Sequence, residues 1–289
     1  MIRLAVRCPN ELADAVLAEL LSLAPGGVEE DEGSDYVEYA IYGAPGELPD
    51  LGPLKATVLD AAPGQSSGEQ RERSLIEVSS TEVPDDWAEK WTDFHKPVLI
   101  GERVRVRPSW EAAAEDGTID IVVDPGQAFG TGAHPTTRLC LELMLDLASE
   151  GRATGPAADW GTGSGVLAIA AAKLGWSPIT GCDHEVAALE AARDNAEANG
   201  VEIELVRLNL RQEAPPPAPT AIANLTSPVL VDIAPRLDAG TSEAPVTLVC
   251  SGMLAAEVDS IALAMGEAGF AERKRRVSGD WGGLLLERG

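Results

Sequence analysis

DWGTGSGVLAIA, the stretch from Asp159 to Ala170, is a glycine-rich turn that leads into an apolar helical segment. Glycines are needed where the backbone must take positive φ or approach a neighbouring group closely. Before and after this turn, the sequence alternates between helical and strand periodicity. The alternation predicts an α/β fold, with a doubly wound and mostly parallel sheet.

The alternation continues to the end of the chain. We expect helices over residues 135–149, 164–174, 185–199, 229–237 and 254–269, and strands ending at 159 and over 179–183, 203–206, 221–224 and 246–250. Two strand-like segments, 273–278 and 281–287, flank Gly279-Asp280 and predict a closing antiparallel hairpin. Residues 121–289 are therefore expected to form one Rossmann-like domain.

The amino-terminal part has a different pattern. A strand over 4–8, a helix over 11–23 and a strand over 37–42 predict a small α+β domain spanning residues 1–70, in which 61–70 has the composition of a linker. Residues 71–120 are expected to connect the two domains. This segment predicts a helix that starts at Asp85 and carries Trp87, Trp91 and Phe94, followed by a β-rich stretch over 98–107 and 119–123.

Acidic residues dominate the composition. The 289 residues include 47 acids and 22 bases, a formal net charge of −25, and residues 1–60 are about twice as acidic per residue as the rest. Such acidity either attracts a basic partner or solvates the surface. A protein that binds phosphate backbones would normally show a basic face, so we expect no direct nucleic-acid binding. Neither a membrane span nor a signal peptide is apparent, which predicts a cytoplasmic protein.

The glycine spacing distinguishes between nucleotide cofactors. A dinucleotide fingerprint would require glycine at the position of Val166. Instead, Gly161, Gly163 and Gly165 form G-x-G-x-G, and Asp183 follows 18 residues later at the end of a predicted strand. This pattern is typical of S-adenosylmethionine binding, in which one carboxylate can accept both ribose hydroxyls. A tight structural turn is the alternative interpretation.

A second glycine-rich loop, DPGQAFGTGAHPTT, spans residues 124–137 and opens the helix before the first parallel strand. A long polar loop at this place could lie over a bound cofactor. Alternatively, it is a helix-entry loop whose threonines cap the helix.

Other candidate sites are weaker. Ser164 lacks the flanking glycines of a nucleophile elbow, so we expect it to cap a helix. The three histidines are far apart in sequence, and the four cysteines form no C-x-x-C pair: His95, His134 and His184, and Cys8, Cys140, Cys182 and Cys250. We therefore predict neither a metal site nor a disulfide.

Taken together, residues 124–137, residues 161–170 and Asn224-Leu225 resemble the ribosomal protein L11 methyltransferase (PrmA) family. Further similar positions are Trp87, Trp91, the turn at 108–110, residues 251–254 and Trp281. The resemblance covers residues 82–289 in sequence, and the first 80 residues only in position and expected fold.

The resemblance implies a class I S-adenosylmethionine-dependent protein methyltransferase with a ferredoxin-like amino-terminal domain for substrate recognition. Its implied partner is the basic ribosomal protein L11 of the large subunit, methylated on lysines and on its amino terminus. Carried over by motif, the resemblance implies that Thr137, Gly161, Asp183 and Asn224 contact the cofactor, with Phe129, Gly130 and Thr131 beside it, and we expect Asp159 and Gly163 of the glycine turn there as well.

Asn224 is the candidate catalytic residue. It ends a predicted parallel strand, where ligands bind in such sheets, and its amide oxygen could orient an incoming amine. It could also be a pure cofactor contact, or simply end the strand.

Three other functions stay open. The chain could methylate lysines of another protein, methylate RNA on the same scaffold, or bind the cofactor without catalysis. An RNA methyltransferase should have a basic groove, but the main basic run is Arg273-Lys274-Arg275-Arg276, which we interpret as a solvated hairpin edge.

Overall fold

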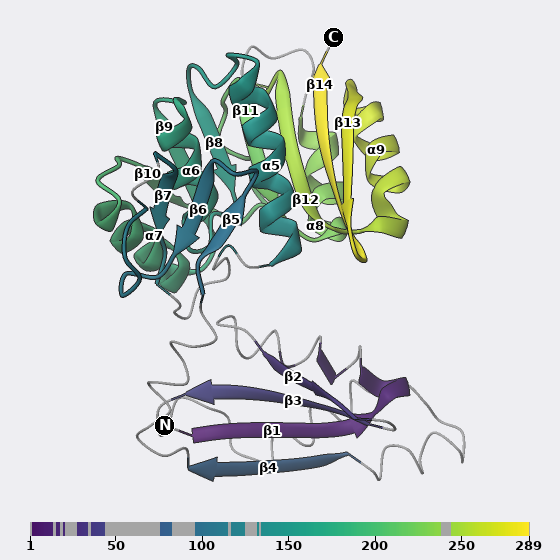
Figure 1. The fold of residues 1–289 in the computed structure, drawn as a ribbon. Coiled ribbons are helices and arrows are strands. Elements are labelled where there is room, and N and C mark those ends of the chain that lie inside the picture. The colour runs from purple at the N-terminus through teal and green to yellow at the C-terminus, as the bar shows by residue number, and fades with distance from the viewer. Residues whose placement is uncertain are drawn as a thin grey trace. The chain divides into compact units, whose positions relative to one another are not determined.

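The computed structural model describes residues 2–13, 16–17, 20, 28–33, 36–43, 76–82, 96–114, 117–124, 132, 134–237 and 244–288. The chain divides into two compact units, Met1–Phe94 and His95–Gly289 (Figure 1). The predicted linker at 61–70 and the predicted helix from Asp85, with Trp87, Trp91 and Phe94, lie outside the described residues. The predicted connecting segment 71–120 is shared between the units, because residues 77–82 belong to the sheet of the first.

An antiparallel four-stranded sheet organises the first unit, with the strand order β2-β3-β1-β4. Its strands are β1 (Ile2–Pro9), β2 (Glu29–Glu32), β3 (Tyr36–Gly43) and β4 (Glu77–Glu82). Val16 and Leu20, which are helical as predicted, are buried in one cluster with Val6 and Ile41. The order agrees with a ferredoxin-like sheet. The segment between β3 and β4 lies outside the described residues, so the ferredoxin-like domain stays a prediction.

The two outer strands of this sheet are not evident from the sequence. β2 reads EEDE and β4 reads EVSSTE, and most of their described side chains are exposed. Periodicity reveals a strand only where one of its faces is buried. Polar edges of this kind also limit pairing with other chains.

A seven-stranded sheet organises the second unit, with the order β10-β9-β8-β11-β12-β14-β13 (Figure 1). Five neighbouring strands, β10 to β12 in this order, are parallel, and β14 runs antiparallel to β12 and β13. The strands are β8 (Ala157–Trp160), β9 (Ile179–Asp183), β10 (Glu204–Arg207), β11 (Thr220–Asn224), β12 (Thr247–Leu254), β13 (Phe270–Ser278) and β14 (Trp281–Arg288). The predicted doubly wound sheet and its closing hairpin are thus confirmed.

Helices cover both faces of this sheet. They are α5 (Pro135–Ser149), α6 (Val166–Leu174), α7 (Val186–Ala198), α8 (Ser227–Ile233) and α9 (Val258–Glu267). Alternate residues of a strand point to opposite faces. Ile222 and Val249 accordingly belong to the core with α5 and α6, whereas Ala221 and Leu248 belong to the core with α8 and α9. The central strands are therefore buried on both sides.

A small third sheet, in the order β5-β6-β7, packs on the α5 and α6 side. It consists of β5 (Val98–Ile100), β6 (Val104–Arg107) and β7 (Ile119–Val122). The β-rich stretch predicted over 98–107 is confirmed, and it forms two strands because Gly101 and Glu102 both take positive φ and turn the chain into a hairpin. β7 then pairs in parallel with β6.

The strand predicted over 246–250 ends too early. β12 continues to Leu254, which pairs with Trp281 of β14, and a 3-10 helix at Ala255–Glu257 leads into α9 at Val258. The strand continues over residues 251–254 because β14 supplies a pairing partner that sequence analysis did not see. The ladder shifts register between Ser251 and Met253, at Gly252 with φ of +92°.

Gly252→Ala should destabilise the protein by roughly 1–3 kcal/mol, because a Cβ there would take an unfavourable φ and overlap the carbonyl of Leu225. Gly266→Ala is the matched control. Gly266 lies inside α9 with open space around its Cα, so this change should stabilise by about 0.5–1 kcal/mol. Thermal and urea unfolding of both variants measure the difference. Equal stabilities would contradict the structure at the β12 irregularity.

Candidate functional site

The glycine turn connects β8 to α6 and consists largely of left-handed backbone. Gly161, Gly163 and Gly165 have φ values of +75°, +52° and +82°. The amides of Gly161 and Thr162 both donate to the carbonyl of Cys182 on β9, each over 2.9 Å. The turn is thereby attached to the carboxyl end of the neighbouring strand.

Neighbouring residues press against the turn from two sides. A Cβ added to Gly161 would lie 2.5 Å from Leu225, and one added to Gly165 would lie 3.1 Å from the Cα of Ala192. Glycine is thus required here both for conformation and for space. Leu225, which follows β11, also donates its amide to the carbonyl of Ser251 over 3.0 Å. The ends of β8 and β11 therefore meet beside Ser251 of β12, and the packing role of Leu225 was not predicted.

The predicted capping role of Ser164 is wrong. α6 starts at Val166, and its capping position is Gly165, which has no side chain. Ser164 instead lies inside the turn, where its carbonyl accepts a 2.9 Å hydrogen bond from Nδ2 of Asn195. The capping position is therefore one residue later than predicted, at the left-handed Gly165.

Asp159 lies behind the turn, with only 1% of its surface exposed. Its Oδ2 accepts from Oγ1 of Thr162 over 2.8 Å and from the amide of Ala168 over 3.1 Å. Within the described residues its Oδ1 has no hydrogen-bond partner, and burial raises the pKa of Asp159 to about 7. The structure places this predicted cofactor residue as a support between the turn and α6.

Asp183 ends β9 and meets the turn directly. Its Oδ2 accepts from the amide of Gly163 over 3.0 Å, and its Oδ1 accepts from the amide of Glu185 over 3.1 Å. Nδ1 of His184 lies 3.3 Å from the same Oδ1. A carboxylate offers about four acceptor positions, so Asp183 keeps capacity for further donors beside the turn. This arrangement fits a ligand with a neutral diol, such as the ribose of S-adenosylmethionine.

Thr137 and Asn224, separated by 87 residues in sequence, are joined at the next strand end. Nδ2 of Asn224 donates to Oγ1 of Thr137 over 3.3 Å. Thr137 is fully buried in the first turn of α5, whereas Asn224 is partly exposed at the end of β11. The hydrogen bond leaves the amide oxygen of Asn224 as the group suited to accept from a ligand.

His134, rather than a threonine, caps α5. Its Nδ1 accepts from the amide of Thr136 over 3.4 Å and lies 2.8 Å from Oγ1 of the same residue. Burial lowers the pKa of His134, which favours the neutral ring that such an acceptor needs. Its ring packs edge-on against Trp281, with the centroids 4.9 Å apart. The signal that could have found it is a His-Pro pair at the start of the helical periodicity.

Three predicted cofactor residues, Phe129, Gly130 and Thr131, lie outside the described residues. The described part of the chain contains no group of three or more histidines, cysteines or acids that could hold a metal ion. No helix in that same part is both long and apolar enough to cross a membrane.

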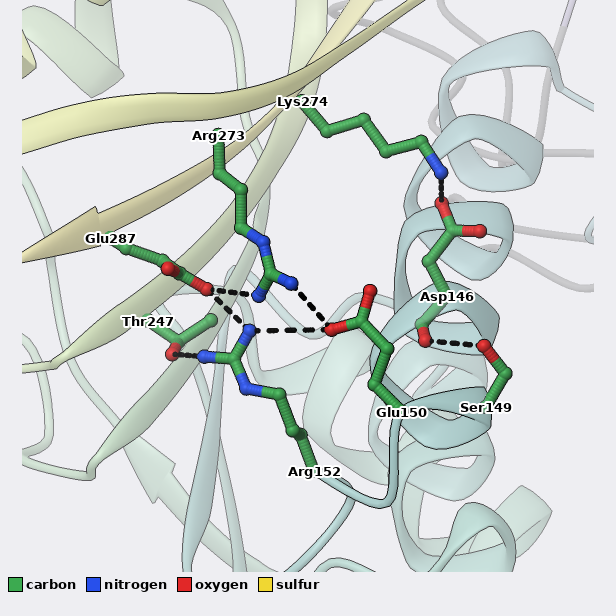
Figure 2. A network of polar contacts seen from close by, with 8 residues as sticks. All are labelled: Asp146, Ser149, Glu150, Arg152, Thr247, Arg273, Lys274 and Glu287. Atoms are coloured by element: carbon green, nitrogen blue, oxygen red, sulfur yellow. Dashed lines mark hydrogen bonds and ion pairs between the residues drawn. The ribbon is translucent and has the colours of Figure 1, made fainter.

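The basic run lies on the exposed edge strand β13, as predicted, and its charges have acidic partners. Figure 2 shows Arg273 and Lys274 reaching across to the end of α5, where Arg273 meets Glu150, the residue after the helix, over 2.7 Å and Lys274 meets Asp146 over 2.6 Å. Arg276 bonds to the same Asp146 over 2.8 Å. The remaining residue, Arg275, pairs with Glu272 and Asp259.

Comparison with known proteins gives a consistent result. A family model described as ribosomal protein L11 methyltransferase (PrmA) matches residues 53–288. The ribosomal protein L11 methyltransferase of Symbiobacterium thermophilum is 33% identical over 301 residues, which span 98% of each chain. That of Pseudomonas fluorescens strain Pf0-1 is 42% identical over 197 residues, 67% of this chain and 65% of the other.

A solved structure is also similar. The ribosomal protein L11 methylase from Lactobacillus delbrueckii subsp. bulgaricus superposes with a TM-score of 0.59 at 30% identity, and it covers 67% of this chain and 99% of its own.

Asp159→Asn should change how stability depends on pH. The pKa of Asp159 is about 7 in the folded protein, above the ordinary value of 3.8 expected for the unfolded chain. The folded state therefore binds this proton more tightly, and stability from Asp159 is present below pH 3.8 and lost as the pH rises to about 7.

The asparagine can still accept from Thr162 and Ala168 but does not ionise. The free energy of unfolding of the variant, relative to the wild type, should thus increase between about pH 4 and pH 7 and then level off. Urea unfolding across this range measures it. A difference that stays constant with pH would contradict the buried position of the carboxylate.

Proposed function

Because the chain belongs to the ribosomal protein L11 methyltransferase (PrmA) family, we propose that it N-methylates lysines, and also the amino terminus, of ribosomal protein L11. The protein is an S-adenosylmethionine-dependent methyltransferase by this membership. The protein would then act in the cytoplasm, where ribosomal proteins are made and assembled.

The observation that carries the proposal is the meeting of two strand ends with the glycine turn. Asp183 bonds to Gly163 and retains acceptor capacity, while Asn224 bonds to Thr137 at the end of β11. Ligands of doubly wound sheets bind outside the carboxyl ends of the strands. We assign the ribose hydroxyls to Asp183 and the close approach of the cofactor to the turn at Gly161.

S-adenosylmethionine, when bound, supplies a methyl group already activated by its sulfonium. The protein then has to align the acceptor nitrogen and exclude water, and positioning of this kind can contribute on the order of 7–11 kcal/mol. The amide oxygen of Asn224 would accept a hydrogen bond from the amine and orient its lone pair. Thr137 would hold that amide in place through the 3.3 Å hydrogen bond.

A lysine acceptor must also lose its proton. With an ordinary pKa near 10.4, only about one lysine in 2,500 is neutral at pH 7, which corresponds to roughly 4.6 kcal/mol. Desolvation lowers the pKa of an amine. We therefore propose that burial of the acceptor at the strand ends, and not a dedicated base, produces the neutral nucleophile.

The first unit would recognise the substrate. Residues 1–60 carry 12 acids and 3 bases, a charge suited to a basic ribosomal protein. Because β4 completes the sheet of this unit, a deletion that tests the role has to remove residues 1–94. The remainder should still bind the cofactor but should not methylate the protein substrate.

The paired basic run favours a protein substrate over RNA. Arg273, Lys274, Arg275 and Arg276 each have at least one acidic partner within 3 Å, so their charge is largely balanced by this chain's own acids. An RNA substrate would need cations that are available to phosphates.

Incubation with labelled cofactor tests the proposed function. Purified L11, other lysine-rich ribosomal proteins and protein-free ribosomal RNA are offered separately. Label in L11 is expected. Label only in RNA would overturn the assignment, and label only in another protein would overturn the choice of substrate.

Asp183→Ala should weaken the binding of S-adenosylhomocysteine by roughly 2–4 kcal/mol, because two hydrogen bonds to the carboxylate are lost. Asp232→Ala, an exposed acid on α8, is the control and should bind normally. Titration calorimetry measures both affinities. Wild-type affinity in a folded Asp183→Ala protein would remove Asp183 from the cofactor site.

Asn224→Ala should lower turnover at saturating substrates by roughly tenfold or more, with a smaller change in cofactor affinity, because its interaction with the amine strengthens in the transition state. Thr137→Val keeps the shape of Thr137 but removes the bond to Asn224, so it should have a weaker effect in the same direction. Unchanged turnover in folded Asn224→Ala would leave Asn224 as a cofactor contact or a strand end.

A further inference from the structure

Two asparagines at the carboxyl-terminal part of α7, Asn195 within the helix and Asn199 at its C-cap, bond through their side chains to the backbone of other elements. Asn195 and Asn199 are four residues apart, and Ala192 lies one turn before them, so all three share a face. Asn195 is only 8% exposed. Asparagine is a poor helix former, and a buried amide is costly unless it is hydrogen-bonded. Asn195 therefore needs a reason other than helix formation.

Asn195 holds the glycine turn. Its Nδ2 donates to the carbonyl of Ser164 over 2.9 Å. That carbonyl lies between Gly163, which bonds to Asp183, and Gly165, which packs tightly on Ala192. The same helix thus supports the turn by a hydrogen bond and by direct packing.

Asn199 holds the end of β7. Its Oδ1 accepts from the amide of Val122 over 2.9 Å, and its Nδ2 donates to the carbonyl of Val122 over 2.6 Å. The side-chain amide thereby pairs with both backbone groups of Val122, as a neighbouring strand would, on the side of β7 away from β6. Nδ2 also donates to the carbonyl of Asn195 over 2.8 Å, which fixes its orientation.

The chain beyond Val122 is held as well. The carboxylate of Asp124 accepts from the amide of Ser109 over 2.6 Å, and Gly132 approaches Val106 so closely that a Cβ would lie 2.7 Å from it. The third sheet therefore fixes residues on both sides of the segment that leads to α5. Through Asn199, this sheet is attached to the helix that supports the glycine turn.

We infer that Asn195 and Asn199 are positioning residues that hold the glycine turn and the end of β7 in fixed relation for cofactor binding. Neither residue needs to touch the cofactor. This inference rests on the proposed assignment of the glycine turn to S-adenosylmethionine. It predicts that removing either side chain weakens cofactor binding more than does a substitution elsewhere that lowers the free energy of unfolding by the same amount.

The test uses the full chain with Asn195→Ala, Asn199→Ala and Asn199→Asp. Ile261→Val, a buried change in α9, is the control matched for stability, and Asp194→Ala is the control for an exposed change on α7. Calorimetry measures the affinity for S-adenosylhomocysteine, and thermal unfolding measures stability. Hydrogen exchange of the free protein, followed over residues 160–166 and 119–124, reports the two attachments without any ligand.

We expect Asn195→Ala to raise the Kd roughly three- to tenfold and to speed exchange over residues 160–166. Asn199→Ala should speed exchange over 119–124 and also raise the Kd. Asn199→Asp keeps the acceptor for the Val122 amide but loses the donor to its carbonyl, so it should lie close to Asn199→Ala. Both controls should keep wild-type affinity.

Two failures can be separated. If the wild-type chain does not bind S-adenosylhomocysteine, the proposed cofactor site itself is wrong. If it binds, but the folded asparagine variants keep the wild-type Kd, or weaken it no more than Ile261→Val does, the positioning role is overturned. Should Asn195→Ala not fold, the two variants at the partly exposed Asn199 decide the outcome in the same way.

Discussion

The end of β8 can turn into α6 only through left-handed backbone, and the rest of the site depends on this constraint. Gly161, Gly163 and Gly165 supply it, and the space beside them is filled by Leu225 and Ala192. The turn therefore sets how closely β11 and α7 can approach β8. Because Gly163 also donates to Asp183, the acidic end of β9 is placed by the same three glycines.

α5 connects this site to the edge of the sheet formed by β14 and β13. Its first turn carries Thr137 beside Asn224, and its cap His134 packs on Trp281 at the start of β14. Its last turns carry the acids that meet the basic strand β13 (Figure 2). Exposed ion pairs are worth little singly, so this network serves mainly to balance charge along the hairpin. The packing of α5 against β12 and β14 provides the firm attachment.

The glycine turn is supported from behind by polar groups of the chain itself. Asp159 lies beneath it, bonded to Thr162 and Ala168, and Asn195 holds its carbonyl at Ser164. Preorganisation of this kind lowers the entropic cost of binding, since the turn does not have to be ordered when the cofactor arrives. Asn195 is an unfavourable residue within α7, and its hydrogen bond to the carbonyl of Ser164 in the neighbouring turn explains its presence there.

The sequence alone determined the doubly wound sheet, the glycine turn, the closing hairpin and the position of Asp183 at a strand end, because these follow from periodicity and from local spacing. It could not reveal β2 and β4, whose polar residues leave no periodic signal, or the hairpin at Gly101. Only the tertiary structure brought Thr137 to Asn224, buried Asp159, and joined Asn199 to Val122. Each of these contacts spans distant elements or depends on burial, and neither distance in space nor burial is encoded in local residue spacing.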